Sequence, residues 1–284
     1  MKILVTGSKG QLGYDCVREL RERGYNDVMA TDIDDLDITN EAGALNYVSK
    51  NKPDVIIHCA SWTAVDKAEE NKESVYKINV LGTKNLVQAA RTVGAKILYI
   101  STDYVFHGDG CSYQEINDFK RPLSVYGKSK LDGEKEIEMY SKHFILRISW
   151  LFGVNGSNFV KTMLKLGKAH KKIDVVCDQI GSPTYAVDLA KLICDMIETE
   201  RYGTYHATNE GICSWADFAE AIFRYSHLNV KVNRVTTKQY LFEKPHQALR
   251  PLNSRLSKKS LDDAGFRRLP SWEDALIRYL REIC

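Results

Sequence analysis

Short apolar runs alternate with longer amphipathic stretches through the first half of the chain. Five of these runs are too short for helices, and their unbroken apolar character is typical of parallel strands covered on both faces. They lie at 3–5, 28–30, 55–57, 97–100 and 144–146. Four intervening stretches carry apolar residues at helical spacing, at 11–23, 41–50, 72–93 and 124–140. The alternation predicts right-handed crossovers and a doubly wound, parallel α/β sheet of the Rossmann type.

The alternation becomes looser after Trp150. We expect a strand at 173–177 and a helix at 188–199 to continue the sheet, and a short strand at 203–207 to follow. Helices then dominate, at 215–226 and 272–283, with a polar stretch at 231–260 between them. We therefore expect a dinucleotide-binding domain over 1–155 and 172–205. A smaller, mostly helical substrate-binding lobe is expected over 156–171 and 206–284.

Charge and cysteine usage narrow the class of protein. The 40 basic and 37 acidic residues are spread along the chain without a block of like charges, which argues against nucleic-acid and membrane-surface partners. No apolar run approaches the roughly 20 residues that span a bilayer. The seven cysteines are scattered and form no close ligand pairs, which is typical of reduced thiols in a cytoplasmic protein rather than of a zinc site.

Three glycines, Gly7, Gly10 and Gly13, follow the first predicted strand and open the first predicted helix. Glycines at such a turn let the backbone approach a pyrophosphate, and the helix N-terminus supplies free N–H groups to it. The alternative is a strand-to-helix turn that binds nothing. The position within a strand–helix–strand unit favours the dinucleotide site, although the Gly-x-x-Gly-x-x-Gly spacing is tighter than in classical dehydrogenases.

An acidic residue, Asp32, ends the second predicted strand about twenty residues further on. A carboxylate there accepts hydrogen bonds from the adenosine ribose and repels a 2′-phosphate, which favours NADH. Asp32 is equally consistent with the start of a polar loop. Because Lys9 is able to offset the repulsion, the preference between NADH and NADPH stays open.

Candidate catalytic residues follow the fourth strand and open the next helix. Thr102 comes directly after the strand, where the carboxyl edge of a parallel sheet binds ligands. Tyr126 and Lys130 are four residues apart, so they share one face of a helix. We expect the Lys130 ammonium to lower the pKa of the Tyr126 phenol, which then protonates a carbonyl oxygen as hydride reaches its carbon. Thr102 would donate a hydrogen bond to the same oxygen.

At this point the sequence resembles the extended short-chain dehydrogenase/reductases that act on nucleotide sugars. The matching segments cover most of the chain: 7–13, 36–39, 63–69, Asn79, 101–106, 125–134, 147–150, 178–184 and 250–254. The resemblance implies that dTDP-4-dehydro-6-deoxy-L-mannose is reduced at C4 to dTDP-L-rhamnose with NADPH or NADH.

The resemblance also implies roles for individual residues. Thr102, Tyr126 and Lys130 would be catalytic, and the last two would also contact the cofactor. The remaining cofactor contacts would be Gly7, Gly10, Gln11, Leu12, Gly13, Asp37, Ile38, Ala60, Ser61 and Thr63, in addition to Asp32. The sugar pocket would be shaped by Val65, Asp103, Tyr126 and Trp150. His58, Cys59, Ser61 and Trp62 differ from the residues usual in that family.

Three further residues have alternative interpretations. Trp150 ends the fifth strand, where it would stack on a sugar or pack in the core. Arg250 would grip a diphosphate with its planar fork or remain a surface charge. His206 fits a structural histidine better than a ligand contact.

Other functions stay open beside the leading one. A reductase or epimerase for another nucleotide deoxysugar would share the catalytic residues. A non-enzymatic, NADP-binding regulatory subunit would have no need of all three. Some relatives form homodimers around a magnesium ion, but Glu273, Asp274 and Glu282 at the C-terminal end do not establish a metal site.

Overall fold

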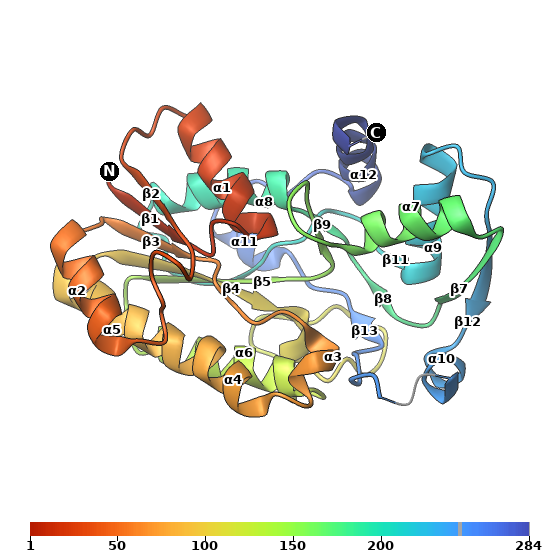
Figure 1. Ribbon diagram of the computed structural model, residues 1–284, viewed down its shortest axis with the longest axis horizontal. Helices are drawn as coiled ribbons and strands as arrows, with labels where there is room; N and C mark the ends of the chain where they lie inside the picture. Colours follow the sequence, from red (N-terminus) through yellow and green to blue (C-terminus); the bar gives the residue numbers. More distant parts are fainter. Residues whose placement is uncertain (244–245, 284) are drawn as a thin grey trace.

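A six-stranded parallel sheet forms the centre of the computed structural model, which describes residues 1–243 and 246–283 (Figure 1). The strand order is β10-β5-β4-β3-β1-β2, and every neighbouring pair is parallel. The strands are β1 (Ile3–Thr6), β2 (Val28–Thr31), β3 (Val55–His58), β4 (Lys96–Thr102), β5 (His143–Ile148) and β10 (Gly203–His206). The predicted doubly wound α/β sheet is confirmed.

Helices cover both faces of this sheet, so its strands are apolar on both sides. One face packs against α1 (Gln11–Glu22), α8 (Ala186–Ile197) and α11 (Lys259–Asp263), and the other against α2 (Glu41–Asn51), α5 (Thr83–Val93) and α6 (Val125–Glu138). Along β1, Ile3 and Val5 point to the first face and Leu4 to the second. Figure 1 shows α1 and α8 on one side of the strands and α2, α5 and α6 on the other.

The helix predicted at 72–93 is interrupted. It consists of α4 (Lys72–Tyr76), a π-helical segment η1 (Lys77–Gly82) and α5. Such wider turns are rare and are often found at functional sites. Here the π-helical turn carries Asn79, whose side chain is buried and fully hydrogen-bonded beside the site described below.

The strand predicted at 173–177 exists but does not continue the central sheet, so that expectation was wrong. β7 (Lys172–Val176) pairs in parallel with β12 (Lys231–Val235), which lies within the stretch read as polar. The alternation along most of β7 explains the difference, since Lys172 and Asp174 are exposed while Ile173 and Val175 pack in the second core. A strand with one solvent-exposed face fits a two-stranded sheet at the periphery, whereas a central parallel strand is buried on both faces. The sixth central strand is β10.

A second core lies beside the sheet. It is built around α7 (Phe159–Ala169), α9 (Trp215–Tyr225) and α12 (Trp272–Ile283), with aromatic packing of Phe152 and Phe218 at its centre. The short elements are α3 (Val65–Ala68), η2 (Asp103–Val105), β6 (Leu151–Phe152), β8 (Ile180–Gly181), β9 (Thr184–Tyr185), β11 (Cys213–Ser214), α10 (Thr237–Glu243) and β13 (Asn253–Ser254). Two of these pairings, β11-β8-β13 and β6-β9, are separate small sheets.

The division of the chain into two domains stays a prediction, although β7 packs in the second core. Within 1–243 and 246–283, no helix has the length and apolar character needed to cross a membrane.

Candidate functional site

The glycine turn between β1 and α1 is closely packed against the end of β3. Gly7 has a φ of +66°, and a Cβ on it would lie 2.6 Å from the Ala60 nitrogen. A Cβ on Gly13 would lie 2.1 Å from the Gly7 carbonyl oxygen. Larger residues are therefore excluded by backbone atoms, which cannot move aside as a flexible side chain can.

The N-terminus of α1 is open for an anion. Its N-cap residue, Gly10, provides no side-chain cap, and its first turn has no acidic residue. The backbone N–H groups of Gln11, Leu12 and Gly13 belong to the first turn, where a helix has no internal acceptors for them. Free N–H groups at the positive end of a helix dipole fit a pyrophosphate. The side chain of Gln11 is held aside by Asn158, whose Nδ2 donates to Gln11 Oε1 at 3.1 Å.

The predicted adenosine contacts lie at the end of β2 and in the following loop. Asp32 accepts the Lys9 backbone N–H at 3.0 Å, so it is tied to the glycine turn. Asp37 is exposed and accepts both the backbone N–H and the hydroxyl of Thr39. These bonds lower the pKa of Asp37, first through the Thr39 hydroxyl. Ile38 is buried beneath the π-helical turn, where a Cβ on Gly82 would meet its side chain at 2.7 Å.

Asn79 connects the segment after β3 to α6, the helix that carries Tyr126. Its Oδ1 accepts the Ser61 hydroxyl at 2.9 Å and the Trp62 N–H at 2.8 Å. Its Nδ2 donates to the Trp62 carbonyl and to Ser129 Oγ, which in turn donates to the Tyr126 carbonyl at 2.7 Å. The segment after β3, which includes Ala60, Ser61 and Thr63, is thereby fixed relative to α6. Sequence reasoning assigned Asn79 no role, although it was one of the positions that carry the family resemblance.

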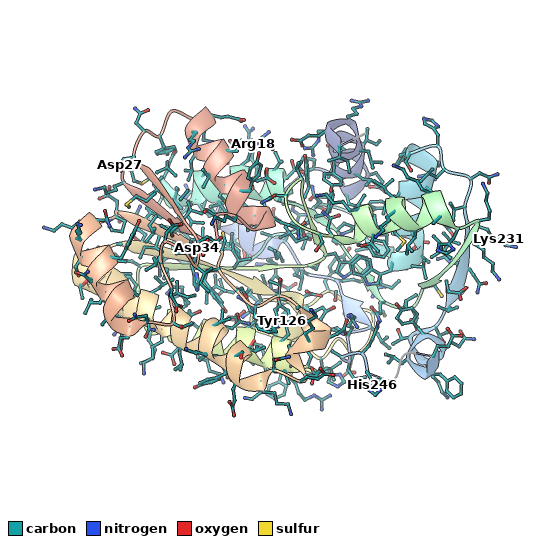
Figure 2. All side chains as sticks on the ribbon, in the orientation of Figure 1. Arg18, Asp27, Asp34, Tyr126, Lys231 and His246 are labelled. Carbon is teal, nitrogen blue, oxygen red and sulfur yellow. The ribbon has the colours of Figure 1, made fainter. Side chains whose placement is uncertain are left out.

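The start of α6 is held by two hydrogen-bond acceptors and by close packing against η2. Ser124 caps the helix by accepting the Gly127 N–H at 3.1 Å, and Glu69 accepts the Val125 N–H at 2.9 Å. A Cβ on Gly127 would lie 2.4 Å from the Tyr104 carbonyl oxygen, so the helix start packs directly on η2. Figure 2 labels Tyr126 at this helix, near α3 and below the central strands.

Lys130 is buried one turn after Tyr126. Its Nζ lies 3.4 Å from Ser61 Oγ and 4.0 Å from the centre of the Tyr99 ring. Burial lowers the pKa of Lys130 to about 7, and the charge of Glu134 opposes this only in part. Glu134 itself is engaged by a buried ion pair with Arg147 at 2.8 Å. The ammonium form of Lys130 is therefore costly in this setting.

Tyr126 faces Thr102 and Asp103. Burial raises the pKa of Tyr126, the negative charge of Asp103 raises it further, and a hydrogen bond with Thr102 lowers it. The pKa of Tyr126 is therefore raised, whereas the Lys130 ammonium was expected to lower it. The Thr102 hydroxyl donates to Asp103 Oδ1 at 2.9 Å, so its proton is committed to that carboxylate in this structure.

Asp103 is buried without a cation beside it. Burial raises its pKa to about 6, while hydrogen bonds from Ser254, Thr102 and the backbone oppose the rise. The Ser254 hydroxyl, on β13, donates to Oδ2 of this carboxylate. A residue of the second half of the chain thus contacts the end of β4, a contact that sequence spacing gave no means to detect.

The predicted sugar-pocket residues come from three separate segments. Val65 begins α3, and Trp150 follows β5 with a left-handed φ of +51°. The indole of Trp150 stacks on Trp215 with ring centres 3.7 Å apart, and Gly181 also packs against it, since a Cβ on Gly181 would lie 3.0 Å from two of its ring atoms. Arg250 Nη2 donates to both carboxylate oxygens of Asp66 at 2.9 Å, so in this structure its fork holds a protein carboxylate.

Two of the three carboxylates considered at the C-terminal end, Asp274 and Glu282, pair with arginines. Glu282 accepts from Arg18 at 2.7 Å, and Asp274 accepts from Arg278 at 2.8 Å. Across the described parts of the chain, no three His, Cys, Asp or Glu side chains are grouped so that they could hold a metal ion. His206 is fully buried, and its Nε2 lies 3.4 Å from Arg147.

The whole chain is similar to proteins of known name. The family described as RmlD substrate binding domain matches residues 1–284. A spore coat polysaccharide biosynthesis protein, SpsK of Bacillus subtilis, is 39% identical over 282 residues, covering 99% of this chain and 97% of that protein.

Two solved structures share the fold closely. A dTDP-4-dehydrorhamnose reductase from Clostridium acetobutylicum superimposes with a TM-score of 0.95 at 44% identity, covering 100% of this chain and 99% of the other. A dTDP-4-dehydrorhamnose reductase from Bacillus anthracis, in complex with NADP, gives 0.94 at 44% identity, covering 99% and 100%. The chain therefore belongs to the dTDP-4-dehydrorhamnose reductase family of extended short-chain dehydrogenase/reductases.

Proposed function

We propose that the chain reduces the C4 carbonyl of dTDP-4-dehydro-6-deoxy-L-mannose to dTDP-L-rhamnose, with NADPH or NADH as the reductant. The observation that supports the proposal is the contact of Tyr126 with Thr102 at the end of β4, with Lys130 one turn later on α6 beside Ser61. Ligands bind at this edge in open parallel sheets. The family supplies the sugar, because its named members act on that substrate.

The chain's own residues would supply orientation and a proton. A bound nicotinamide provides the hydride. Tyr126 gives its phenolic proton to the C4 oxygen, and the raised pKa keeps this proton on Tyr126 until the oxygen becomes basic. Thr102 orients the Tyr126 hydroxyl and, once turned away from Asp103, donates to the same oxygen. Lys130 holds the cofactor ribose from its position beside Ser61.

The sugar would lie between the sheet edge and the small sheet that contains β13. Trp150 would offer part of its indole ring, Val65 an apolar side chain, and Asp103 a carboxylate. Arg250 would exchange Asp66 for the nucleotide diphosphate, which offers the same planar arrangement of oxygens to a guanidinium.

The test is a turnover assay with each reduced cofactor and this keto-sugar, following loss of cofactor absorbance and identifying the sugar product. We expect oxidation of cofactor in proportion to dTDP-L-rhamnose formed. Turnover with a different keto-sugar nucleotide, but not with this one, would assign another deoxysugar. No turnover with any keto-sugar, despite cofactor binding, would favour a regulatory subunit.

We also propose that the chain is cytoplasmic and that two copies associate as a homodimer. The six described cysteines are all free thiols, as in a reducing compartment; Cys284 lies outside the described residues. The homodimer rests on the family resemblance, and light scattering that gives the mass of a single chain would contradict it.

A further inference from the structure

The glycine turn and the end of β2 carry a local arrangement of charges that the reduction does not use. Lys9, in the turn, forms an ion pair with Asp34 at 2.8 Å. Asp32 and Asp35 flank this pair. The pKa of Lys9 is raised first by the hydrogen bond to Asp34, then by the charges of Asp34, Asp35 and Asp32, so all three carboxylates face the one ammonium group.

Two backbone contacts place this group of charges at the ribose end of the cofactor site. The Ser8 N–H donates to the Thr31 carbonyl at 3.0 Å, and the Lys9 N–H donates to Asp32 Oδ2 at 3.0 Å. The turn is therefore fastened to the last residue of β2. In this fold, the acidic residue at that position faces the 2′-hydroxyl of the adenosine ribose. The Lys9 side chain extends from the same point.

Asp32 is suited to a ribose hydroxyl and unsuited to a phosphate. Its Oδ2 accepts the Lys9 N–H and its Oδ1 accepts the Ile33 N–H at 2.9 Å, so the carboxylate is held in place. Each oxygen keeps a lone pair for a hydroxyl donor. A dianionic 2′-phosphate beside it needs a cation, and the Lys9 side chain, whose own backbone N–H binds Asp32, would provide one.

The ion pair of Lys9 can be exchanged easily. Both side chains are exposed, Lys9 by 64% and Asp34 by 76%. Exposed ion pairs contribute little because water and salt screen them. A phosphate offers two negative charges and three acceptor oxygens, so it competes well against a single carboxylate for the same ammonium.

We propose that Lys9 binds the 2′-phosphate of NADPH and that Asp34 competes with that phosphate for Lys9, so that the pair sets the balance between NADPH and NADH. The inference rests on the proposed use of a nicotinamide cofactor. It assigns the preference to two residues outside the catalytic group, with Asp32 as the constant acceptor for the ribose of NADH.

The test measures dissociation constants for NADPH and NADH, by calorimetry, in the full chain and in Lys9→Gln and Asp34→Asn. Lys9→Gln is expected to weaken NADPH about tenfold, the loss of one charge-assisted contact, while NADH changes by less than about threefold. Asp34→Asn is expected to tighten NADPH several-fold because it frees Lys9 and removes a repelling charge. Added salt should weaken NADPH more steeply in the wild type than in Lys9→Gln.

A matched pair elsewhere provides the control. Lys259 and Asp263 on α11 form a comparable exposed ion pair at 2.5 Å, with exposed fractions of 67% and 61%. Lys259→Gln and Asp263→Asn should leave both constants unchanged. Equal shifts for NADPH and NADH in the Lys9 and Asp34 variants, or no shift in either, would overturn the proposal.

The same comparison with 2′,5′-ADP and 5′-AMP isolates the ribose end of the site. These probes carry no nicotinamide, so their result is independent of the sugar and of turnover. A changed preference for 2′,5′-ADP in a protein that reduces no keto-sugar would uphold this inference while refuting the proposed reaction. Failure of the wild type to bind any of the four nucleotides would refute both.

Discussion

Tyr126 is the residue on which the proposed chemistry depends most directly. Replacing it by Phe removes the phenolic proton but keeps the ring, which lies edge-on to the Tyr104 ring at 5.8 Å. We expect kcat to fall by about 10²–10⁴, the usual contribution of a positioned proton donor, with cofactor affinity nearly unchanged. Steady-state kinetics and cofactor titration on the same preparation measure both quantities.

Tyr104→Phe is the matched control for this variant. It makes the same chemical change on a neighbouring ring, whose hydroxyl is hydrogen-bonded to Arg250. We expect a smaller loss, seen mainly as a higher KM for the nucleotide sugar. Equal losses of kcat in the two variants would remove the special role of Tyr126.

Lys130 illustrates a conflict between activity and stability. Its pKa is lowered to about 7, so the folded state resists a proton that the unfolded chain keeps up to about pH 10. Below pH 7 the buried charge therefore costs stability in full, and the cost fades as the pH rises to 10. Lys130→Met should raise the free energy of unfolding by roughly 2–4 kcal/mol at pH 6 while suppressing turnover.

Urea unfolding at pH 6 and at pH 10 tests this prediction. The gain should be present at pH 6 and largely lost at pH 10, where the folded state is neutral and the unfolded chain is beginning to lose its proton. Lys128→Met, two residues earlier and exposed, should show no such pH-dependent gain. A Lys130→Met protein that is less stable than the wild type at pH 6 would contradict the direction of the pKa shift.

At the scale of elements, the position of α6 depends on close contact with β4 and the π-helical turn. A Cβ on Gly133 would lie 2.3 Å from the Tyr99 hydroxyl oxygen and 2.7 Å from the Asn79 carbonyl oxygen. Since the second atom is backbone, the helix must shift. Gly133→Ala should cost about 1–3 kcal/mol despite its better helix propensity, and should lower kcat by displacing Tyr126.

Gly43 in α2 provides the comparison for this variant. There the three atoms nearest to a Cβ all belong to the Asn40 side chain, the closest at 3.1 Å, and none of the proposed catalytic residues lies on that helix. Thermal unfolding and kinetics of the two alanine variants separate packing from propensity. If Gly133→Ala matched Gly43→Ala in both, the contact between α6 and the π-helical turn would not position the site.

Sequence patterns predicted the positions of helices and strands better than they predicted which strands pair. The five strands of the first half appear where apolar runs predicted them, because strands buried on both faces leave a local signature. β7 also appears, but its sheet was misassigned, since the pattern within a strand does not identify its neighbour. The π-helical turn was missed because it keeps helical spacing on either side of Asn79.

The site was predictable only where residues are close in sequence. Tyr126 and Lys130 share a helix face, so their spacing was informative. The contacts of Asp103 with Ser254 and of Arg250 with Asp66 join residues that are 151 and 184 positions apart. No local pattern encodes such contacts. The protonation behaviour also depended on burial, which reversed the expected direction of the Tyr126 pKa.

At the scale of the whole molecule, two buried histidines make the fold sensitive to acid. His58 and His206 are at most 1% exposed, and burial lowers the pKa of each to about 3. His58 is satisfied as a neutral ring between Thr6 and Thr83, at 2.9 Å and 3.1 Å. Thr83 gives its own proton to the Asn79 carbonyl, so Nε2 of His58 must be the donor. A second proton on this ring would displace the hydrogen bond that Thr6 donates to Nδ1 and would add a charge near Lys130.

The sign of the pH dependence follows from these values. Between pH 6.5 and pH 3 the unfolded chain binds protons on both histidines while the folded chain does not, so stability falls as the pH falls through this range. Asp103, whose pKa is raised to about 6, acts in the opposite direction between pH 6 and pH 4.

His58→Gln keeps one donor and one acceptor but cannot be charged. We expect it to flatten the loss of unfolding free energy between pH 6.5 and pH 4 by roughly 2–3 kcal/mol, measured by urea unfolding at several pH values. His227→Gln replaces a histidine for which no such role is proposed, so it should leave the slope unchanged; a slope equally unchanged in His58→Gln would mean that His58 is not the acid-sensitive group.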